Sequence, residues 1–403
     1  MADFLSESAK PWNVSVSLRG FYDDNINSAG GPLKQEAWGF EVRPSIGFLW
    51  TTEQTSLRLG YAYDFTYYDH RPTGNTDKYD QNHNFDLGLA HSFSPNVQLS
   101  VADSFVIGQE PDVLRADPTF TTFQRIHGDN IRNYGFVNLD VQLSRLFGLQ
   151  LGYANSYWDY DDDNTFGGTR VSNSGLLDRV EHMVHLDARW QLAPTTVGLI
   201  GYQFREVSYT GDQSISLDDP SIKSDSRDSR SHYVYAGAEH TFRPDLTGSL
   251  KAGASFIDYY NNGQDDVAPY VSGSLKYVYL PESSVEAGFT YDRNATQLFS
   301  DNGNGDITLD AQSATVWCNV RHKFTPHIFG TITGQIQNSS YNGGTLDGKN
   351  DLFFLAGVNL EYRFNQYLAT SVGYNFDHLD SNVNDPNRDF DRNRVYLGVT
   401  ASY

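Results

Sequence analysis

The last ten residues, Arg394 to Tyr403, alternate strictly between apolar and polar side chains. The apolar row consists of Val395, Leu397, Val399, Ala401 and Tyr403. A period of two is typical of a β-strand whose two faces meet different surroundings. Ending a chain on such an aromatic residue suits a membrane, because the apolar row can face lipid while the ring lies at the interface. This segment therefore predicts a transmembrane β-barrel.

The composition argues against the other class of membrane protein, the helical bundle. Mean hydropathy is −0.51, and no apolar run approaches the roughly 18 residues that a spanning helix needs. A barrel tolerates this polarity because only alternate residues face lipid. The formal net charge of −21 speaks against a nucleic-acid partner, which would require a basic surface. The single cysteine, Cys318, excludes an internal disulfide and is expected to be a small buried or lipid-facing side chain.

An aromatic marker followed by a short polar or proline-containing turn recurs along the whole chain. The markers are Trp50, Phe93, Phe147, Trp190, Phe242, Tyr279, Phe324, Phe364 and Tyr403. Their spacing fits two strands, one tight turn and one longer loop. Nine markers predict nine hairpins, that is, an all-β, up-and-down antiparallel barrel of about 18 strands. The last strand must then pair with Asn13 to Tyr22, since an open edge cannot persist in lipid.

The turn lengths give the barrel a direction. Short turns follow the markers, whereas Gly-, Asn-, Asp- and Ser-rich loops such as 206–230 and 301–310 lie opposite. This asymmetry predicts short periplasmic turns and longer extracellular loops. We expect one outer-membrane barrel over residues 1–403, with 1–11 as a periplasmic tail. The first ten residues lack a signal peptide's basic and apolar regions, so a bacterial outer-membrane location requires a mature chain.

The strand face opposite the apolar one carries charges of both signs, which cannot be buried dry. Water must therefore fill the barrel, as expected once about 16 to 18 strands open an aqueous lumen. We expect the lumen to be lined by Arg19, Arg43, Arg58, Asp64, Asp140, Asp187, Arg189, Lys251, Arg321, Glu361 and Arg363.

The segment from Glu110 to Ile131 mixes charges with large apolar rings, which a freely solvated loop would not need. In trimeric diffusion porins the loop at this place in the strand order folds into the lumen and narrows it. By that resemblance in topology, Asp112, Arg115, Asp117 and Arg125 are expected to set pore size and charge at a constriction. The alternative is a lid packed over the mouth.

Other side chains with chemical potential have simpler explanations. The acidic clusters 161–164 and 301–306 could bind calcium, but neither fits the EF-hand pattern, so a solvated surface and no metal are expected. No catalytic motif or cofactor signature is present, and we expect no enzyme. Aromatic rings near the outer strand ends belong either to an interfacial girdle or, for Trp158, Tyr259, Tyr270 and Trp317, to a surface that stacks on sugars. Asp103, His91 and His182 lie on lipid-facing rows, where a polar group is costly at mid-membrane. Three explanations stay open: a subunit interface, a β-bulge that re-aims the side chain, or a position at interfacial depth.

The first strand ends in Phe21-Tyr22-Asp23-Asp24-Asn25. With the 18-strand meander, this segment resembles a putative β-barrel porin family of Gram-negative outer membranes, some members of which are associated with exopolysaccharide export. The resemblance implies a channel for small hydrophilic solutes or a secreted polysaccharide. The alternative is a structural or adhesive surface barrel with a plugged pore. Implied partners are membrane lipid and lipopolysaccharide, the assembly machinery that recognises a C-terminal aromatic such as Tyr403, a periplasmic export partner, and further copies of the chain.

Overall fold

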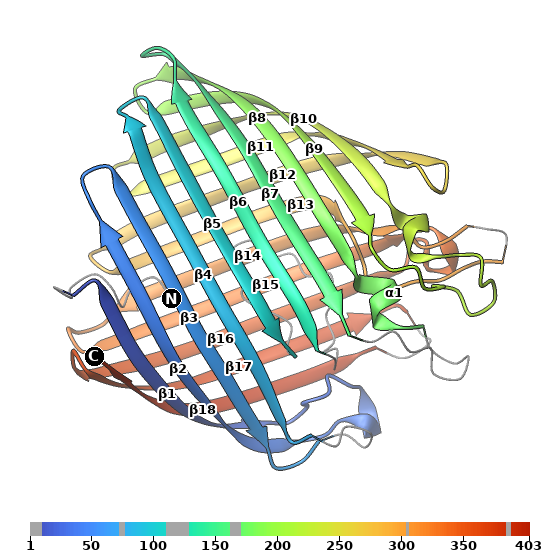
Figure 1. Ribbon diagram of the computed structural model, residues 1–403, viewed down its shortest axis with the longest axis horizontal. Coiled ribbons are helices and arrows are strands. Elements are labelled where there is room, and N and C mark those ends of the chain that lie inside the picture. The colour runs from blue at the N-terminus through green and yellow to red at the C-terminus, as the bar shows by residue number, and fades with distance from the viewer. Residues whose placement is uncertain (1–9, 72–76, 110–128, 162–170, 304–305, 384–387) are drawn as a thin grey trace.

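The computed structural model describes residues 10–71, 77–109, 129–161, 171–303, 306–383 and 388–403. Within them the chain forms one 18-stranded antiparallel sheet that closes on itself (Figure 1). Each strand pairs with its neighbours in the sequence, and β1 (Trp12–Asp23) also pairs with β18 (Phe390–Ser402). The predicted up-and-down barrel and its strand count are confirmed.

The remaining strands are β2 (Ala37–Thr51), β3 (Thr55–Tyr68), β4 (Tyr79–Ser94), β5 (Val97–Gly108), β6 (Asn130–Gln142), β7 (Phe147–Tyr160), β8 (Arg179–Ala193), β9 (Thr196–Tyr209), β10 (Ser229–Arg243), β11 (Leu246–Tyr259), β12 (Gln264–Leu280), β13 (Ser283–Asn294), β14 (Asp310–Lys323), β15 (Ile328–Asn342), β16 (Asn350–Asn365) and β17 (Leu368–Ser381). Short helices are α1 (Asn173–Leu177), η1 (Gly31–Leu33), η2 (Ser224–Arg227) and η3 (Gly344–Leu346). A strand of about 14 residues, tilted by about 45°, spans roughly 30 Å, the thickness of a bilayer's hydrocarbon core. Within the described ranges, no helix is long and apolar enough to cross a membrane.

The two ends of the barrel differ as predicted. Turns such as 95–96, 194–195 and 366–367 make one end, which we call the short-turn end. Loops such as 210–228 and 295–309 make the other, the long-loop end. The aromatic markers lie at the short-turn end, where Trp50, Phe93 and Phe324 are exposed. The markers thus follow the rim of the barrel.

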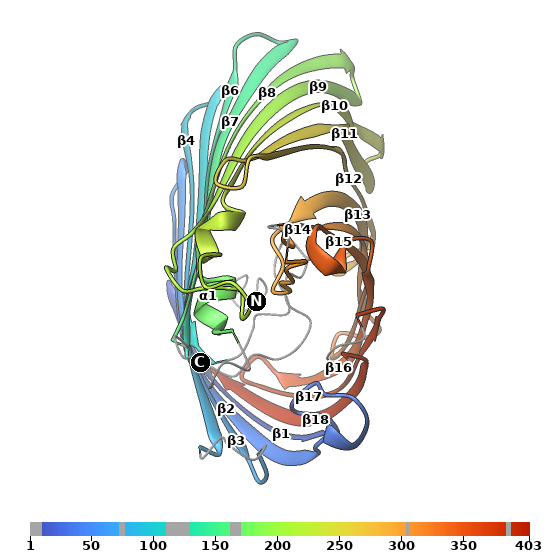
Figure 2. The same cartoon turned by 90° about the vertical axis from the view of Figure 1, so that its right-hand side faces the viewer.

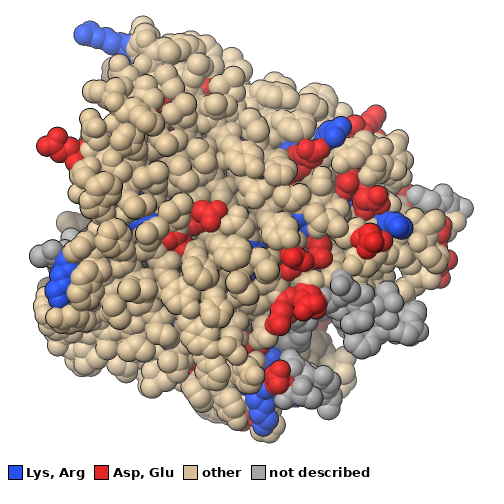
Figure 3. Space-filling view, viewed as in Figure 1, with Lys and Arg blue, Asp and Glu red and all other residues tan. Residues whose placement is uncertain are grey.

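The strands form because their side chains alternate between two environments. On β16, Leu352, Val358 and Leu360 point outward and are exposed, whereas Asn359 and Glu361 lie on the inner row. Figure 3 shows the result on the outer wall: much of it carries no charge, and charged side chains gather toward the long-loop end. An apolar outer wall and a polar inner wall are what a membrane barrel requires.

The seam between the first and last strands carries a polar clasp. Backbone pairing runs from Ser15 and Ser402 to Asp23 and Arg394. Beyond it, Asp23 binds Arg392 at 2.6 Å, Asp24 accepts the backbone N–H of Asn393 at 2.7 Å, and the Asn25 amide donates to the carbonyl of Asp391 at 2.8 Å. The motif Asp23-Asp24-Asn25 therefore extends the seam beyond its last backbone pair.

Candidate pore and its mouth

The structure places every predicted lumen residue on an inner-facing row. Arg19 follows the exposed Leu18, Arg58 precedes the exposed Leu59, and Lys251 follows the exposed Leu250. The same alternation holds for Arg43, Asp64, Asp140, Asp187, Arg189, Arg321, Glu361 and Arg363. Their role in lining a water-filled lumen stays a prediction.

Most of these charges pair with opposite charges along the inner wall. The ion pairs are Arg19–Glu41 (3.4 Å), Arg43–Asp64 (3.1 Å), Arg189–Glu239 (2.5 Å), Lys251–Asp187 (2.8 Å) and Arg363–Glu361 (2.5 Å). Asp140 instead accepts from the amide of Gln150 at 2.8 Å. Several members remain partly exposed, so each pair stabilises the fold only weakly. The pairs place charges of opposite sign next to each other along the inner wall.

One inner-wall network is centred on a fully buried carboxylate. Asp187 is 0% exposed and accepts from the hydroxyl of Tyr235 at 2.6 Å and from Lys251 at 2.8 Å. Gly201 makes room for it, since a Cβ there would lie 2.2 Å from the Asp187 carboxylate and 2.3 Å from the Tyr235 ring. The sequence predicted Asp187 and Lys251, but Tyr235 and Gly201 carry no local signal of this role.

Three cations, which we call the basic patch, gather on one wall near the short-turn end, and two of them also pair with carboxylates, Arg363 with Glu361 and Lys323 with Glu282. The ring of Phe329 is 5% exposed, and the cationic groups of Arg363, Lys323 and Arg321 lie 4.0, 5.5 and 5.9 Å from its centre. Cations over an aromatic face are attracted by the ring quadrupole, and their stems shield the ring from water. Phe329 thus gathers three positive charges from β14 and β16 on one side of the lumen.

At the long-loop end, two loops fold into the barrel. Ile222 from 210–228, and Phe299, Ile307 and Leu309 from 295–309, pack on inner-facing side chains of β11 and β12. Figure 2 shows these segments and α1 inside the outline of the wall. Leu177 of α1 packs with the inward-facing Trp158 and Tyr160 of β7. The loops therefore narrow the mouth, an arrangement that the sequence did not predict.

The infolded segments are joined by buried arginines. Arg227, 1% exposed, donates to the carbonyls of Thr296 at 3.0 Å and Leu176 at 2.7 Å. Arg205 binds Glu181 at 2.5 Å and donates to the carbonyl of Arg293 at 3.0 Å. Arg227 thus links the loop before β10 with α1 and with the loop before β14, and Arg205 links β9 with β8 and β13.

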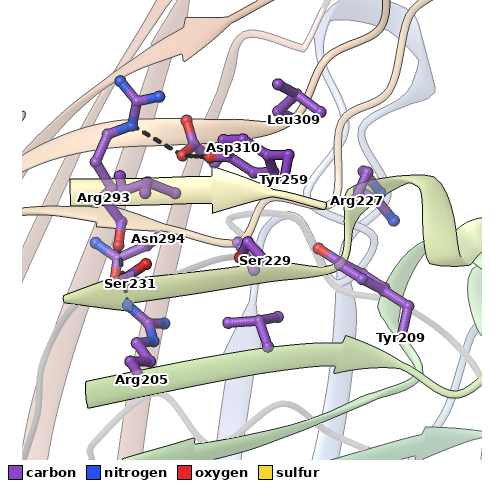
Figure 4. A pocket seen from close by; sticks show the side chains of 13 residues that line it. Arg205, Tyr209, Arg227, Ser229, Ser231, Tyr259, Arg293, Asn294, Leu309 and Asp310 are labelled. Carbon is purple, nitrogen blue, oxygen red and sulfur yellow. Dashed lines mark hydrogen bonds and ion pairs between the residues drawn. The ribbon is translucent and has the colours of Figure 1, made fainter. Parts of the chain in front are cut away.

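A carboxylate completes the mouth network. Figure 4 shows Arg293 and Tyr259 meeting at Asp310, with Arg227 beside Tyr209. Arg293 lies 2.8 Å from Asp310 and 2.8 Å from Asp266, and the Tyr259 hydroxyl also donates to Asp310. Backbone pairing between β12 and β13 extends only as far as Val271 and Tyr291. Arg293 therefore joins the two strands by an ion pair beyond the point where their ladder ends.

Several expectations need correction or lie outside the described residues. Trp158 and Tyr259 are 7% and 3% exposed, buried under Arg179 and the infolded loop, so they cannot stack on a passing sugar. Asp112, Arg115, Asp117 and Arg125 fall in 110–128, outside the described residues. Among the described side chains, no group of three or more His, Cys, Asp or Glu could hold a metal ion.

Comparisons with known proteins identify the family. Residues 12–403 match the family described as "Putative beta-barrel porin 2". No curated protein matches the chain significantly. Similar solved structures include OccAB4 of Acinetobacter baumannii (13% identity, 98% of this chain and 99% of that one, TM-score 0.45) and OpdK of Pseudomonas aeruginosa (13%, 97% and 99%, 0.45). A BenF-like porin of Pseudomonas fluorescens Pf-5 is similar too (12%, 97% and 99%, 0.46). Because the family match covers nearly the whole sequence, the chain belongs to this β-barrel porin family and is a porin-type protein of the bacterial outer membrane.

Proposed function

We propose that the barrel conducts small hydrophilic solutes through a water-filled lumen of mixed charge. The observation that carries this proposal is the inner wall, where ion pairs such as Arg189–Glu239 remain partly exposed, with side chains 24% and 40% accessible. Charges placed in this way require water beside them. Nearly compensated charge suits neutral and weakly charged solutes, since strong selection for one sign would require a lining of the opposite sign.

The infolded mouth favours small solutes over a polymer. Loops 210–228 and 295–309 bury apolar side chains such as Ile215 and Ile307, at 0% and 2% exposure, and they bond to each other from Ser216 to Asp301 at 3.2 Å. A polysaccharide duct would need this packing to open for every chain that passes. The loop 110–128, with Asp112, Arg115, Asp117 and Arg125, is proposed as a second element of the constriction.

Planar-bilayer recording tests the channel directly. The refolded barrel is expected to insert with discrete current steps, and vesicles that contain it are expected to swell in small neutral sugars but not in long oligosaccharides. A barrel that is folded by circular dichroism but carries no current would instead favour the plugged structural or adhesive barrel. Loss of secreted polysaccharide on gene deletion, together with oligosaccharide passage, would favour the export duct.

A further inference from the structure

Three strands that run toward the short-turn end finish on the same pattern, His-x-Phe-x-Pro. The residues are His91, Phe93 and Pro95 at the end of β4, His240, Phe242 and Pro244 at the end of β10, and His322, Phe324 and Pro326 at the end of β14. In each case His and Phe continue an outward-facing apolar row. The three phenyl rings are 58%, 56% and 60% exposed. The same unit is therefore built three times on the outer rim.

The geometry of the three units agrees closely. The His and Phe rings meet edge to face with centroids 4.5 Å apart and interplanar angles of 80°, 75° and 81°. Each His Nδ1 lies 2.8 Å from a hydroxyl, which belongs to Thr55, Thr196 or Tyr279. When that hydroxyl donates to Nδ1, the imidazole proton resides on Nε2. Each unit then presents one donor, Nε2–H, on an imidazole ring whose orientation is already fixed by the hydrogen bond at Nδ1.

The position of the units indicates what that N–H meets. On β16 the same place holds Tyr362 and Phe364, which are also edge to face at 4.9 Å and 77°, and on β8 it holds Trp190 and Leu192. Rings with an apolar body and one polar atom concentrate where lipid chains end and headgroups begin. A phosphate oxygen is the strong acceptor at that depth, and hydrogen bonds to ionised acceptors are the stronger class.

We propose that the three His-Phe units bind phospholipids at the short-turn rim, with Nε2–H donating to a lipid phosphate and the Phe ring packing on the adjoining acyl chain. This explains why polar His91 lies on a lipid-facing row: its Nδ1 is satisfied by Thr55 and its Nε2 by the lipid. The proposal concerns the outer wall and holds whether or not the pore conducts.

Native mass spectrometry of the purified full-length barrel tests the proposal. Phosphatidylglycerol is titrated into wild type and into the triple variant His91→Phe, His240→Phe, His322→Phe. Phe keeps the ring but removes its nitrogen atoms, so we expect phosphatidylglycerol to be retained roughly three- to tenfold more weakly per site. The matched control is His185→Phe, which makes the same change on the inner row of β8 and should leave lipid retention unchanged.

A phosphate-free lipid separates recognition from packing. Monogalactosyldiacylglycerol should be retained equally by wild type and the triple variant. Equal phosphatidylglycerol retention by both proteins would overturn the proposal, and so would equal losses of the two lipids, which would indicate a plain aromatic girdle. If the triple variant fails to fold, Thr55→Val and Thr196→Val decide, since they keep the imidazole but remove the hydroxyl that orients it. These two variants should weaken the binding of phosphatidylglycerol but not that of monogalactosyldiacylglycerol. Unchanged phosphatidylglycerol binding in both variants would refute the assignment.

Discussion

Replacing Arg227 by Ala is expected to loosen the mouth of the barrel. Its guanidinium joins three segments, since it comes from 210–228, donates to Thr296 and Leu176, and lies 4.2 Å from the Tyr209 ring. Ala would leave both carbonyls without their donor. A hydrogen bond from a charged donor contributes about 1.5–3 kcal/mol, and the cost of burying the cation offsets part of two such bonds.

We therefore expect the packed arrangement of the loops to lose about 3 kcal/mol. At about 1.4 kcal/mol for each factor of ten, the ratio of open to packed loops should rise about 100-fold. Two assays detect this change. Single-channel records should show larger or more frequent excursions above the wild-type conductance, and trypsin should cut the folded barrel at Lys223, within the loop, correspondingly faster.

Arg230→Ala is the matched control. Arg230 lies three positions away, is half exposed and pairs with Glu206 at 3.0 Å, so its loss should change neither readout beyond the small effect of a surface ion pair. Wild-type conductance and wild-type cleavage at Lys223 in Arg227→Ala would refute the reasoning, and so would equal changes in the two variants.

Three further predictions concern charge. Asp187→Asn removes the buried partner of Lys251, so the zero-current potential in a salt gradient should shift toward anion selectivity; a shift toward cations would contradict the inner placement of Asp187. Arg363→Ala removes one cation from the basic patch and should shift the same potential the other way. Burial of Asp24 opposes ionisation, but hydrogen bonds from Lys34 and Asn393 outweigh it and hold the pKa of Asp24 below its usual range. The stability that ionised Asp24 gives to the fold is therefore complete above the usual carboxyl pKa and is lost as pH falls through the lowered pKa of Asp24. Wild type and Asp24→Asn should differ in unfolding midpoint at neutral pH and converge in strong acid.

The architecture was predictable because it depends on local pattern. Alternation such as Leu352 to Phe364 specifies a strand with two faces wherever it occurs, and each marker at a tight turn specifies where a hairpin reverses. Pairing of the first and last strands follows from closure alone. Arg205 lies on an inner row of β9, so the same period-two test, applied to that strand, would have found it.

The mouth was not predictable for a physical reason. Loop 295–309 is rich in Asp, Asn and Gly, a composition that serves a solvated loop and an infolded one equally. What folds it inward is contact of Ile307 and Leu309 with Ile257 and Tyr259, side chains far away in the sequence. Ile257 and Tyr259 belong to an ordinary alternating strand, and nothing local shows that a loop covers them.

The clasp at the seam sets the timing of assembly. Arg392 and Asp23 are separated by 369 positions, so no contact of this kind exists until nearly all of the chain is present. Bringing such distant segments together is costly in chain entropy and slow, while every earlier intermediate holds two unpaired strand edges. A chain arrested before β18 would therefore leave an open sheet in the bilayer, and membrane insertion of this protein is expected to be all or none.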